Sequence, residues 1–173
     1  MKIRIVGGSG SGKTHLAKKL SKKLNISHLD TDELKWKSKK DYSVSRTREE
    51  KRILLNTFLK NYDSWIVEGA TGSPWNWRTF VEADIIIILK APLWREYSRV
   101  LKRSLRRFLG LEKGRKERLK DILDLYRWVK KFRTENMPAL LQKLDQENIK
   151  YIICKNKNDR KRVLESPLRS LMT

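Results

Sequence analysis

The sequence predicts an α/β fold in which five parallel strands form a sheet with helices on both faces. Short, continuously apolar runs alternate with longer runs of helical periodicity, which is the pattern of a parallel sheet buried on both sides. A glycine-rich loop joins the first apolar run directly to the first helical run. The 173 residues are enough for one such sheet with a proper core.

The predicted strands are short runs rich in β-branched residues. They are residues 2–6, 25–29, 64–67, 84–89 and 150–154. The helical patterns lie at residues 15–24, 48–61, 94–109, 118–132, 139–147 and roughly 159–164. Pro138 interrupts a helical stretch, so we expect a kink or a break there. No repeat or long linker divides the chain, and we expect residues 1–173 to form a single domain.

Residues 7–14 match the complete pattern G-x-x-x-x-G-K-[ST]. Such a loop wraps backbone N–H groups around nucleotide phosphates, helped by the positive end of the following helix. We expect Lys13 to reach the β- and γ-phosphates as a catalytic residue and the Thr14 hydroxyl to bind Mg²⁺. The predicted nucleotide-binding residues are Gly8, Ser9, Gly10, Ser11, Gly12, Lys13, Thr14, His15 and Asn156, the last of which follows the fifth strand.

Acidic residues follow two of the predicted strands, at the edge where parallel sheets bind their ligands. Asp30 and Asp32 follow the second strand, and Glu68 follows the third. Phosphoryl transfer needs a metal ion near the phosphates and a group that orients the acceptor. We expect Asp30 to assist the metal ion and the acceptor, and Asp32 and Glu68 to bind substrate. The alternatives are a helix cap at Asp30 or Thr31 and a turn carboxylate at Glu68.

Asp84 is interpreted as structural because it precedes its strand, whereas a metal-binding acid should follow one. Trp75 and Trp77 come after the third strand, where an acceptor pocket would form. Their rings could stack on a base or a sugar, and packing in the core is the alternative. We expect Trp77 and the adjacent Arg78 to contact the substrate.

The segment from residue 99 to residue 120 carries ten Lys or Arg residues and two acids. One helical face would present Arg99, Arg103, Arg106 and Arg107. Gly110 and Gly114 follow as a flexible joint, so we interpret the segment as a lid-like insertion that closes over phosphates. Arg103 and Arg107 are the predicted catalytic arginines, because guanidinium groups match phosphate oxygens. A solvated basic face is the alternative.

The composition favours a polyanionic partner, since 41 Lys and Arg residues against 20 Asp and Glu residues give a net charge of +21. Nucleotides, nucleic acids and acidic membranes all fit this charge. Cys154 is the only cysteine, which excludes an intramolecular disulfide and fits a reducing cytosol. The longest apolar run, residues 85–89, is too short to span a bilayer. We expect a cytoplasmic protein with no membrane partner, as a monomer or weak dimer.

Several of these segments together resemble the bacterial DNA topology modulation proteins, which are relatives of adenylate kinase and shikimate kinase among the P-loop NTPases. The resemblance spans residues 1 to about 133. It rests on the phosphate loop, His28-Leu29-Asp30 with Trp36 downstream, Trp65-Ile66-Val67-Glu68-Gly69, and Ala83-Asp84 before the isoleucine strand. It implies a sheet of the nucleoside-monophosphate-kinase type, a lid, ATP and Mg²⁺.

The resemblance also implies roles for particular residues. The Asp30-Thr31-Asp32 run is similar to the D-x-D of small-molecule kinases, which would place Asp30 beside the metal ion and the acceptor. Arg103 and Arg107 would match arginines of the lid or of adenine stacking. The chain has no match to the AMP-binding segment of adenylate kinase, and Glu68-Gly69-Ala70 replaces the glycine triplet of shikimate kinases.

Two hypotheses for the function follow from the sequence. The first is an ATP-dependent phosphotransferase that acts on a small molecule or nucleotide. The alternative is a nucleic-acid-associated ATP-binding regulator, in which the basic surface contacts phosphate backbone. The sequence does not identify the acceptor.

Overall fold

A computed structural model describes residues 1–37, 44–111 and 119–166. Its strands are β1 (Lys2–Gly7), β2 (Ser27–Asp30), β3 (Trp65–Gly69), β4 (Ile85–Leu89) and β5 (Ile152–Cys154). They form one five-stranded sheet in the order β2-β3-β1-β4-β5, and every pairing is parallel. The predicted fold class is therefore confirmed.

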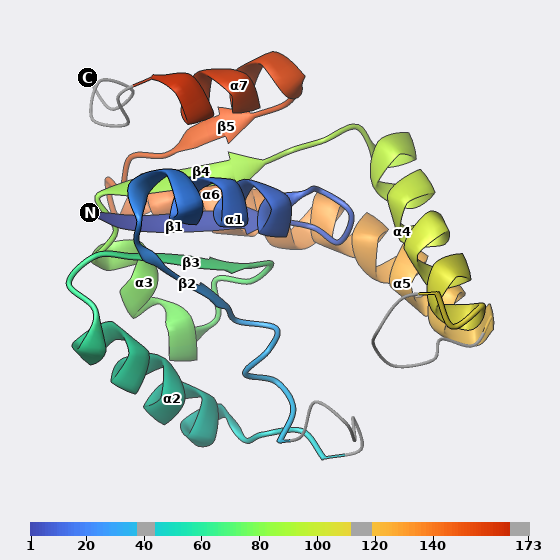
Figure 1. Cartoon of the computed structure of the whole chain (residues 1–173), viewed down its shortest axis with the longest axis horizontal. Coiled ribbons are helices and arrows are strands. Elements are labelled where there is room, and N and C mark those ends of the chain that lie inside the picture. Colours follow the sequence, from blue (N-terminus) through green and yellow to red (C-terminus); the bar gives the residue numbers. More distant parts are fainter. Residues whose placement is uncertain (38–43, 112–118, 167–173) are drawn as a thin grey trace.

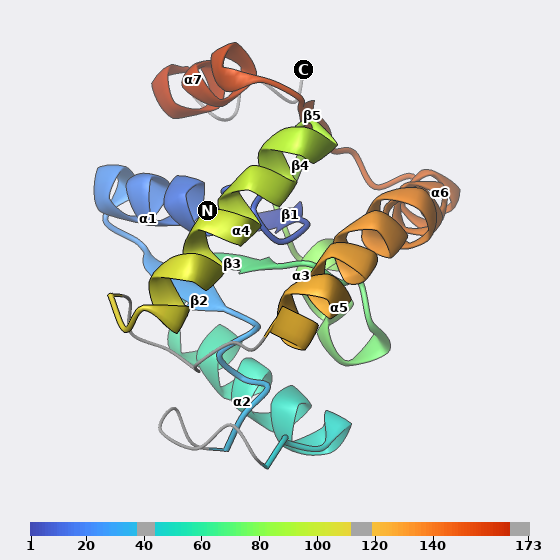
Figure 2. The ribbon, with the colours of Figure 1, turned by 90° about the vertical axis from the view of Figure 1, so that its right-hand side faces the viewer.

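Helices cover both faces of this sheet (Figures 1 and 2). They are α1 (Lys13–Leu24), α2 (Arg48–Asn61), α3 (Arg78–Val81), α4 (Leu93–Phe108), α5 (Leu119–Lys131), α6 (Met137–Gln146) and α7 (Lys157–Glu165). A 3₁₀ turn, η1 (Pro74–Asn76), precedes α3, and a π-helical turn, η2 (Phe132–Asn136), joins α5 to α6. Neither η1 nor α3 was predicted, because each is shorter than two helical turns and gives almost no periodic signal.

Successive side chains of β1 point to opposite faces of the sheet, and each face has its own cluster of buried side chains. Ile3 and Ile5 pack with Leu16 and Leu20 of α1 and with Val163 of α7 on one face. The other face packs against η2, α3 and α6 through a second cluster of buried side chains. Because β1 is central and its neighbours are buried on both faces, its carboxyl end is a rigid base for the loop that follows.

Two sequence-based expectations differ from the structure in ways that matter for the site. β3 runs two residues beyond the predicted end at residue 67, so Glu68 lies inside the strand and is fully buried. Around Pro138 the chain stays helical: the backbone widens to the π turn just before it, and the proline occupies the first turn of α6. The π turn accommodates the proline, because the missing N–H group falls where the usual i→i−4 bonding pattern is already interrupted.

The helices α4 and α5 lie side by side beyond the carboxyl ends of the strands (Figures 1 and 2). The predicted lid-like insertion at 99–120 falls on them, and its central part, residues 112–118, lies outside the described residues. Among the residues that are described, no helix is long and apolar enough to cross a membrane.

The exits of β2 and β3 are held together at Thr31 and Gly69. The Thr31 backbone N–H donates to the Glu68 carbonyl oxygen at 2.9 Å. A Cβ atom on Gly69 would lie 1.9 Å from the Thr31 Oγ1 atom. A glycine is therefore required here by close approach, which brings the two acidic strand ends next to each other.

We predict that Gly69→Ala destabilises the protein by about 1–3 kcal/mol, the usual cost of overpacking. Thr31→Ala removes the clashing hydroxyl, so in that background the same change should cost much less. Urea unfolding of the four proteins measures this coupling. An equal cost in both backgrounds would contradict the close approach.

Candidate functional site

The phosphate loop leaves β1 at the carboxyl edge of the sheet and enters α1. Gly10 and Gly12 have φ angles of +78° and +92°, a region that L side chains rarely adopt. A Cβ atom on Gly10 would also lie 2.5 Å from the Glu96 backbone oxygen. No side chain caps the first N–H groups of α1, so these donors remain available to an anion.

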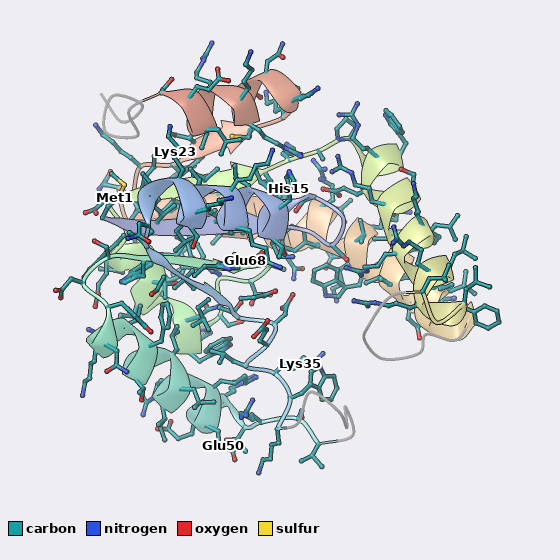
Figure 3. All side chains as sticks on the ribbon, in the orientation of Figure 1. Met1, His15, Lys23, Lys35, Glu50 and Glu68 are labelled. Carbon is teal, nitrogen blue, oxygen red and sulfur yellow. The ribbon has the colours of Figure 1, made fainter. Side chains whose placement is uncertain are left out.

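A chain of three side chains connects the start of α1 to β3 and β2. The Thr14 hydroxyl donates to Glu68 Oε2 at 3.1 Å, and His28 Nε2 lies 3.2 Å from Glu68 Oε1. Glu68 is fully buried, and it lies at the carboxyl end of the sheet below α1 (Figure 3). The structure thus brings the predicted metal-binding hydroxyl onto a buried carboxylate.

His28 is a member of this chain that the sequence-based site did not include. The sequence could have predicted it, because residues two apart in a strand share a face and His28 lies two residues before Asp30. Its side chain is 15% exposed, and its ring holds one of the two Glu68 oxygens. It therefore fixes the orientation of the carboxylate toward Thr14.

Asp30 ends β2 beside Glu68, its register partner in β3. Burial, and then the charges of Glu68 and Asp32, raise the pKa of Asp30 to about 6, while Lys13 opposes the shift. Asp30 Oδ1 also accepts a 2.9 Å hydrogen bond from the Asp32 backbone N–H. The three predicted carboxylates therefore gather at one edge, with Lys13, only 9% exposed, as a nearby positive charge.

A fully buried arginine adds a positive charge near this acidic cluster. Arg4 occupies the middle of β1 with no exposed surface. Its Nη2 donates to the Thr71 carbonyl at 3.1 Å, and its guanidinium lies 4.8 Å from the centre of the Phe80 ring. Burial lowers the pKa of Arg4 to about 10, although Glu68, Asp32 and Asp30 act in the opposite direction. The arginine stays charged, and we interpret it as the counter-charge of the carboxylates.

The helix α4 places arginines against the outside of the phosphate loop. Arg99 Nη1 donates to the Gly10 carbonyl at 3.0 Å, and Arg103 Nη2 donates to Ser9 Oγ at 3.1 Å. Arg107, the other predicted catalytic arginine, follows Arg103 one turn later on the same face of α4. The loop and the predicted lid helix are therefore in direct contact.

Further charged groups at the loop come from distant parts of the chain. Glu96 is 1% exposed and lies 3.3 Å from Arg133 of η2. Arg160 of α7 places Nη1 3.1 Å from where a Gly12 Cβ atom would be. Burial raises the pKa of Glu96, against the effect of Arg133, Arg160 and Arg99. No local pattern could have found this cluster, because its charged groups come from three separate elements, α4, η2 and α7.

Trp77 and Arg78, which were predicted to contact substrate, are not brought to the phosphate loop. Trp77 stacks on Phe80, and its Nε1 donates to Glu147 at 3.0 Å. Arg78 pairs with Glu82, whose carboxylate also binds the Lys2 side chain at the start of β1. Arg78 therefore lies at the amino end of the sheet, opposite the loop.

The other predicted residues have simpler surroundings. Asn156 caps α7, because its Oδ1 accepts the backbone N–H groups of Asn158 and Asp159 at 2.8 and 3.0 Å. His15 is exposed in the first turn of α1. Asp84 accepts the Lys2 backbone N–H at 2.7 Å at the amino end of the sheet, which agrees with a structural role.

The donor set at the loop fits Mg²⁺ rather than a metal held by protein ligands alone. Within the described ranges, no group of three or more His, Cys, Asp or Glu side chains is arranged around a common metal position. Mg²⁺ is usually held by one or two protein oxygens together with substrate phosphates and water. The Thr14 hydroxyl and the adjacent carboxylates of Glu68 and Asp30 supply oxygens of this kind.

Comparison with known proteins identifies the fold of this chain and leaves its activity open. No protein-family model matches the chain. A Bacillus subtilis (strain 168) protein described as "Uncharacterized protein YqaC" is 33% identical over 106 residues, which cover 61% of this chain and 58% of that protein. Shikimate kinase from Acinetobacter baumannii in complex with shikimate superposes with a TM-score of 0.62 and 19% identity, covering 98% of this chain and 92% of the other. The chain therefore has the fold of a P-loop kinase.

We predict that Asp30→Asn stabilises the ligand-free protein at neutral pH. Because the pKa is raised from 3.8 to about 6 in the folded state, folding binds a proton, and stability falls as pH rises through this window. The asparagine resembles the protonated acid, so the variant should gain up to about 3 kcal/mol at pH 7 and lose this advantage toward pH 4. Urea unfolding from pH 4 to pH 8 measures the difference.

Asp63→Asn is the matched control, since Asp63 is exposed in the turn after α2. Asp63→Asn removes one negative charge from the surface and leaves the buried carboxylates in place. Equal stability of wild type and Asp30→Asn at pH 7 would contradict the burial of a charged carboxylate at this position.

Proposed function

We propose that this protein is an ATP-dependent phosphotransferase acting on a small molecule or nucleotide. The observation that carries the proposal is the 3.1 Å contact between Thr14, in the complete phosphate loop, and the buried Glu68, with Asp30 at the adjacent strand end. Here three carboxylates gather beside a loop suited to phosphates, as phosphoryl transfer requires.

Each residue of the site has a role in this proposal. Lys13 and the backbone N–H groups of residues 8–14 bind the phosphates of ATP. Thr14 and Asp30 hold Mg²⁺, which when bound neutralises phosphate charge, and Glu68 orients Thr14. Asp30 also accepts the proton of the acceptor hydroxyl, as a general base does.

Space for an acceptor adjoins the exit of β3. A cavity of about 410 Å³ is lined there by the loop that follows Gly69 and by η2 and α6. This volume is within the range of small-molecule sites. Its lining residues are Ala70, Thr71, Gly72, Ser73, Glu135, Asn136, Ala139, Leu140 and Lys143. Five of these residues have polar side chains that could bind an acceptor with hydrogen-bonding groups, and Asp32, just after β2, would contact it.

The proposal includes the lid. Residues 1–173 would act as one unit in which the basic insertion at 99–120 closes over the transferred phosphoryl group. The contacts of Arg99 and Arg103 with loop oxygens support this, because ATP phosphates would compete for the same guanidinium groups. Arg103 and Arg107 would then stabilise the charge of the transition state.

The kinase fold shared with shikimate kinase supports phosphotransfer, and the fold alone does not identify the acceptor. The alternative is a nucleic-acid-associated ATP-binding regulator, which the net charge of +21 and the resemblance to DNA topology modulation proteins favour. A regulator would bind ATP without acceptor-stimulated turnover. A screen of nucleoside monophosphates, sugars and hydroxy acids for stimulated ADP release separates the two functions.

We predict that MgATP stabilises the wild-type protein and that Lys13→Ala removes most of this effect. ATP at about 100 times its dissociation constant should add roughly 2.7 kcal/mol to the free energy of unfolding. Thermal unfolding with and without MgATP measures it. Lys18→Ala, on the exposed side of the same helix, is the control and should keep the full shift. Equal shifts in wild type and Lys13→Ala would overturn the role of Lys13.

We further predict that Asp30→Asn lowers turnover of the best acceptor by 10²-fold or more, roughly the effect of losing a general base. ATP binding should be largely retained, since the phosphate loop is untouched. Asp84→Asn is the matched control at the opposite edge of the sheet and should leave turnover nearly unchanged. Wild-type turnover in Asp30→Asn would reduce this residue to a structural carboxylate.

A further inference from the structure

The exposed side of α1 is a dense array of lysines. Lys18, Lys19, Lys22 and Lys23 are all exposed, while Leu16, Ala17 and Leu20 of the same helix are buried against the sheet. The helix contains no Asp or Glu. Over the described ranges, no carboxylate lies within ion-pair distance of Lys18, Lys19 or Lys22.

The helix α7 extends this array, because α1 and α7 lie side by side on the same face of the sheet (Figures 1 and 2). Its exposed cations, with the one that precedes it, are Lys155, Lys157, Lys161 and Arg162. Lys23 of α1 donates to the Leu164 carbonyl of α7, so the two sets of cations are continuous. We call these eight residues the α1–α7 surface.

Acidic groups do little to neutralise this surface. The Asp159 carboxylate accepts hydrogen bonds from the backbone N–H groups of Lys155 and Asn156. Glu165 lies 3.9 Å from Lys161 at the far end of α7. Like charges one helical turn apart repel one another, so the unbalanced lysines do not stabilise the fold. They are best explained by a polyanionic partner.

The side chains favour a nucleic acid over a membrane as that partner. Interfacial membrane binding needs exposed apolar side chains beside the basic ones. None of the exposed large apolar residues of the described ranges lies on α1 or α7. Such residues are found on α4, where Trp94, Leu101, Leu105 and Phe108 are exposed.

The composition also favours a duplex over a single strand. Proteins that bind single strands stack bases on aromatic rings, and α1 and α7 contain no Phe, Tyr or Trp. A surface of lysines with no base-reading elements matches backbone phosphates alone. We infer that the α1–α7 surface binds the phosphate backbone of a nucleic-acid duplex without sequence preference.

This inference goes beyond the proposed phosphotransferase activity and stands apart from it, because none of the eight cations belongs to the phosphate loop. The test uses the full chain and a fluorescent 24-base-pair DNA duplex of random sequence, titrated at several salt concentrations. Lys18, Lys19 and Lys22 are changed together to Gln. The matched control changes Lys60, Lys102 and Lys130 to Gln, which are exposed on α2, α4 and α5 and reduce the net charge equally.

The wild-type protein should bind the duplex with a steep salt dependence, and the control should bind like wild type. The α1 triple variant should have a slope of log K against log salt that is flatter by about 0.9 for each lost contact. Its thermal shift with MgATP should be unchanged, which shows that the fold and nucleotide site are intact.

Three results would overturn the inference. The first is no salt-dependent duplex binding by the wild type. The second is an equal loss in both triple variants, which would mean that only net charge matters. The third is binding to phosphatidylglycerol–phosphatidylcholine vesicles in place of the duplex, which would assign the surface to a membrane.

Discussion

The arrangement of the site depends on one buried carboxylate, Glu68. A fully buried acid in a central strand is unfavourable unless its oxygens are satisfied and its charge is balanced. Thr14 and His28 bind its two oxygens, and Arg4 lies behind it as a buried counter-charge. The two bonded partners come from α1 and β2, so the Glu68 carboxylate ties both elements to β3 beside the phosphate loop.

Gathering three carboxylates at one edge of the sheet costs stability, and we interpret that cost as a requirement of function. Burial, and then the nearby charges of Glu68 and Asp32, raise the pKa of Asp30 to about 6. A sequence selected for stability alone would replace one of these acids by a neutral residue. Proteins usually keep such unfavourable clusters where a ligand or metal ion relieves them. The gain in stability expected from Asp30→Asn and the loss of turnover are therefore two effects of the same charge.

The sequence predicted the local parts of the molecule and missed the parts assembled over long distances. The phosphate loop was found because one continuous octapeptide sets its backbone geometry, and Asp30 and Glu68 because strand ends meet at one edge. Arg4, by contrast, looks like a single polar interruption of an apolar strand, and nothing local shows that its buried charge balances the carboxylates at the neighbouring strand ends. Glu96, Arg133 and Arg160 meet only when α4, η2 and α7 fold against the loop. Arg78 follows β3 in the chain, but the chain has already turned back toward the amino end of the sheet when it reaches this residue.

The two kinds of cation in this chain are used in different ways. Around the phosphate loop the charges other than Lys13 are arginines, whose fixed planar groups hold particular backbone and hydroxyl oxygens, as Arg99 and Arg103 do. On the exposed side of α1 the charges are lysines, which are flexible and strongly hydrated, and in the described ranges Lys18, Lys19 and Lys22 have no carboxylate within ion-pair distance. A site that must orient one phosphoryl group gains from guanidinium geometry, whereas a surface that follows a regular phosphate backbone needs only charge density. The contrast between arginines at the loop and lysines on α1 therefore fits the two ligands that we propose, a nucleotide at the loop and a polymer along the α1–α7 surface.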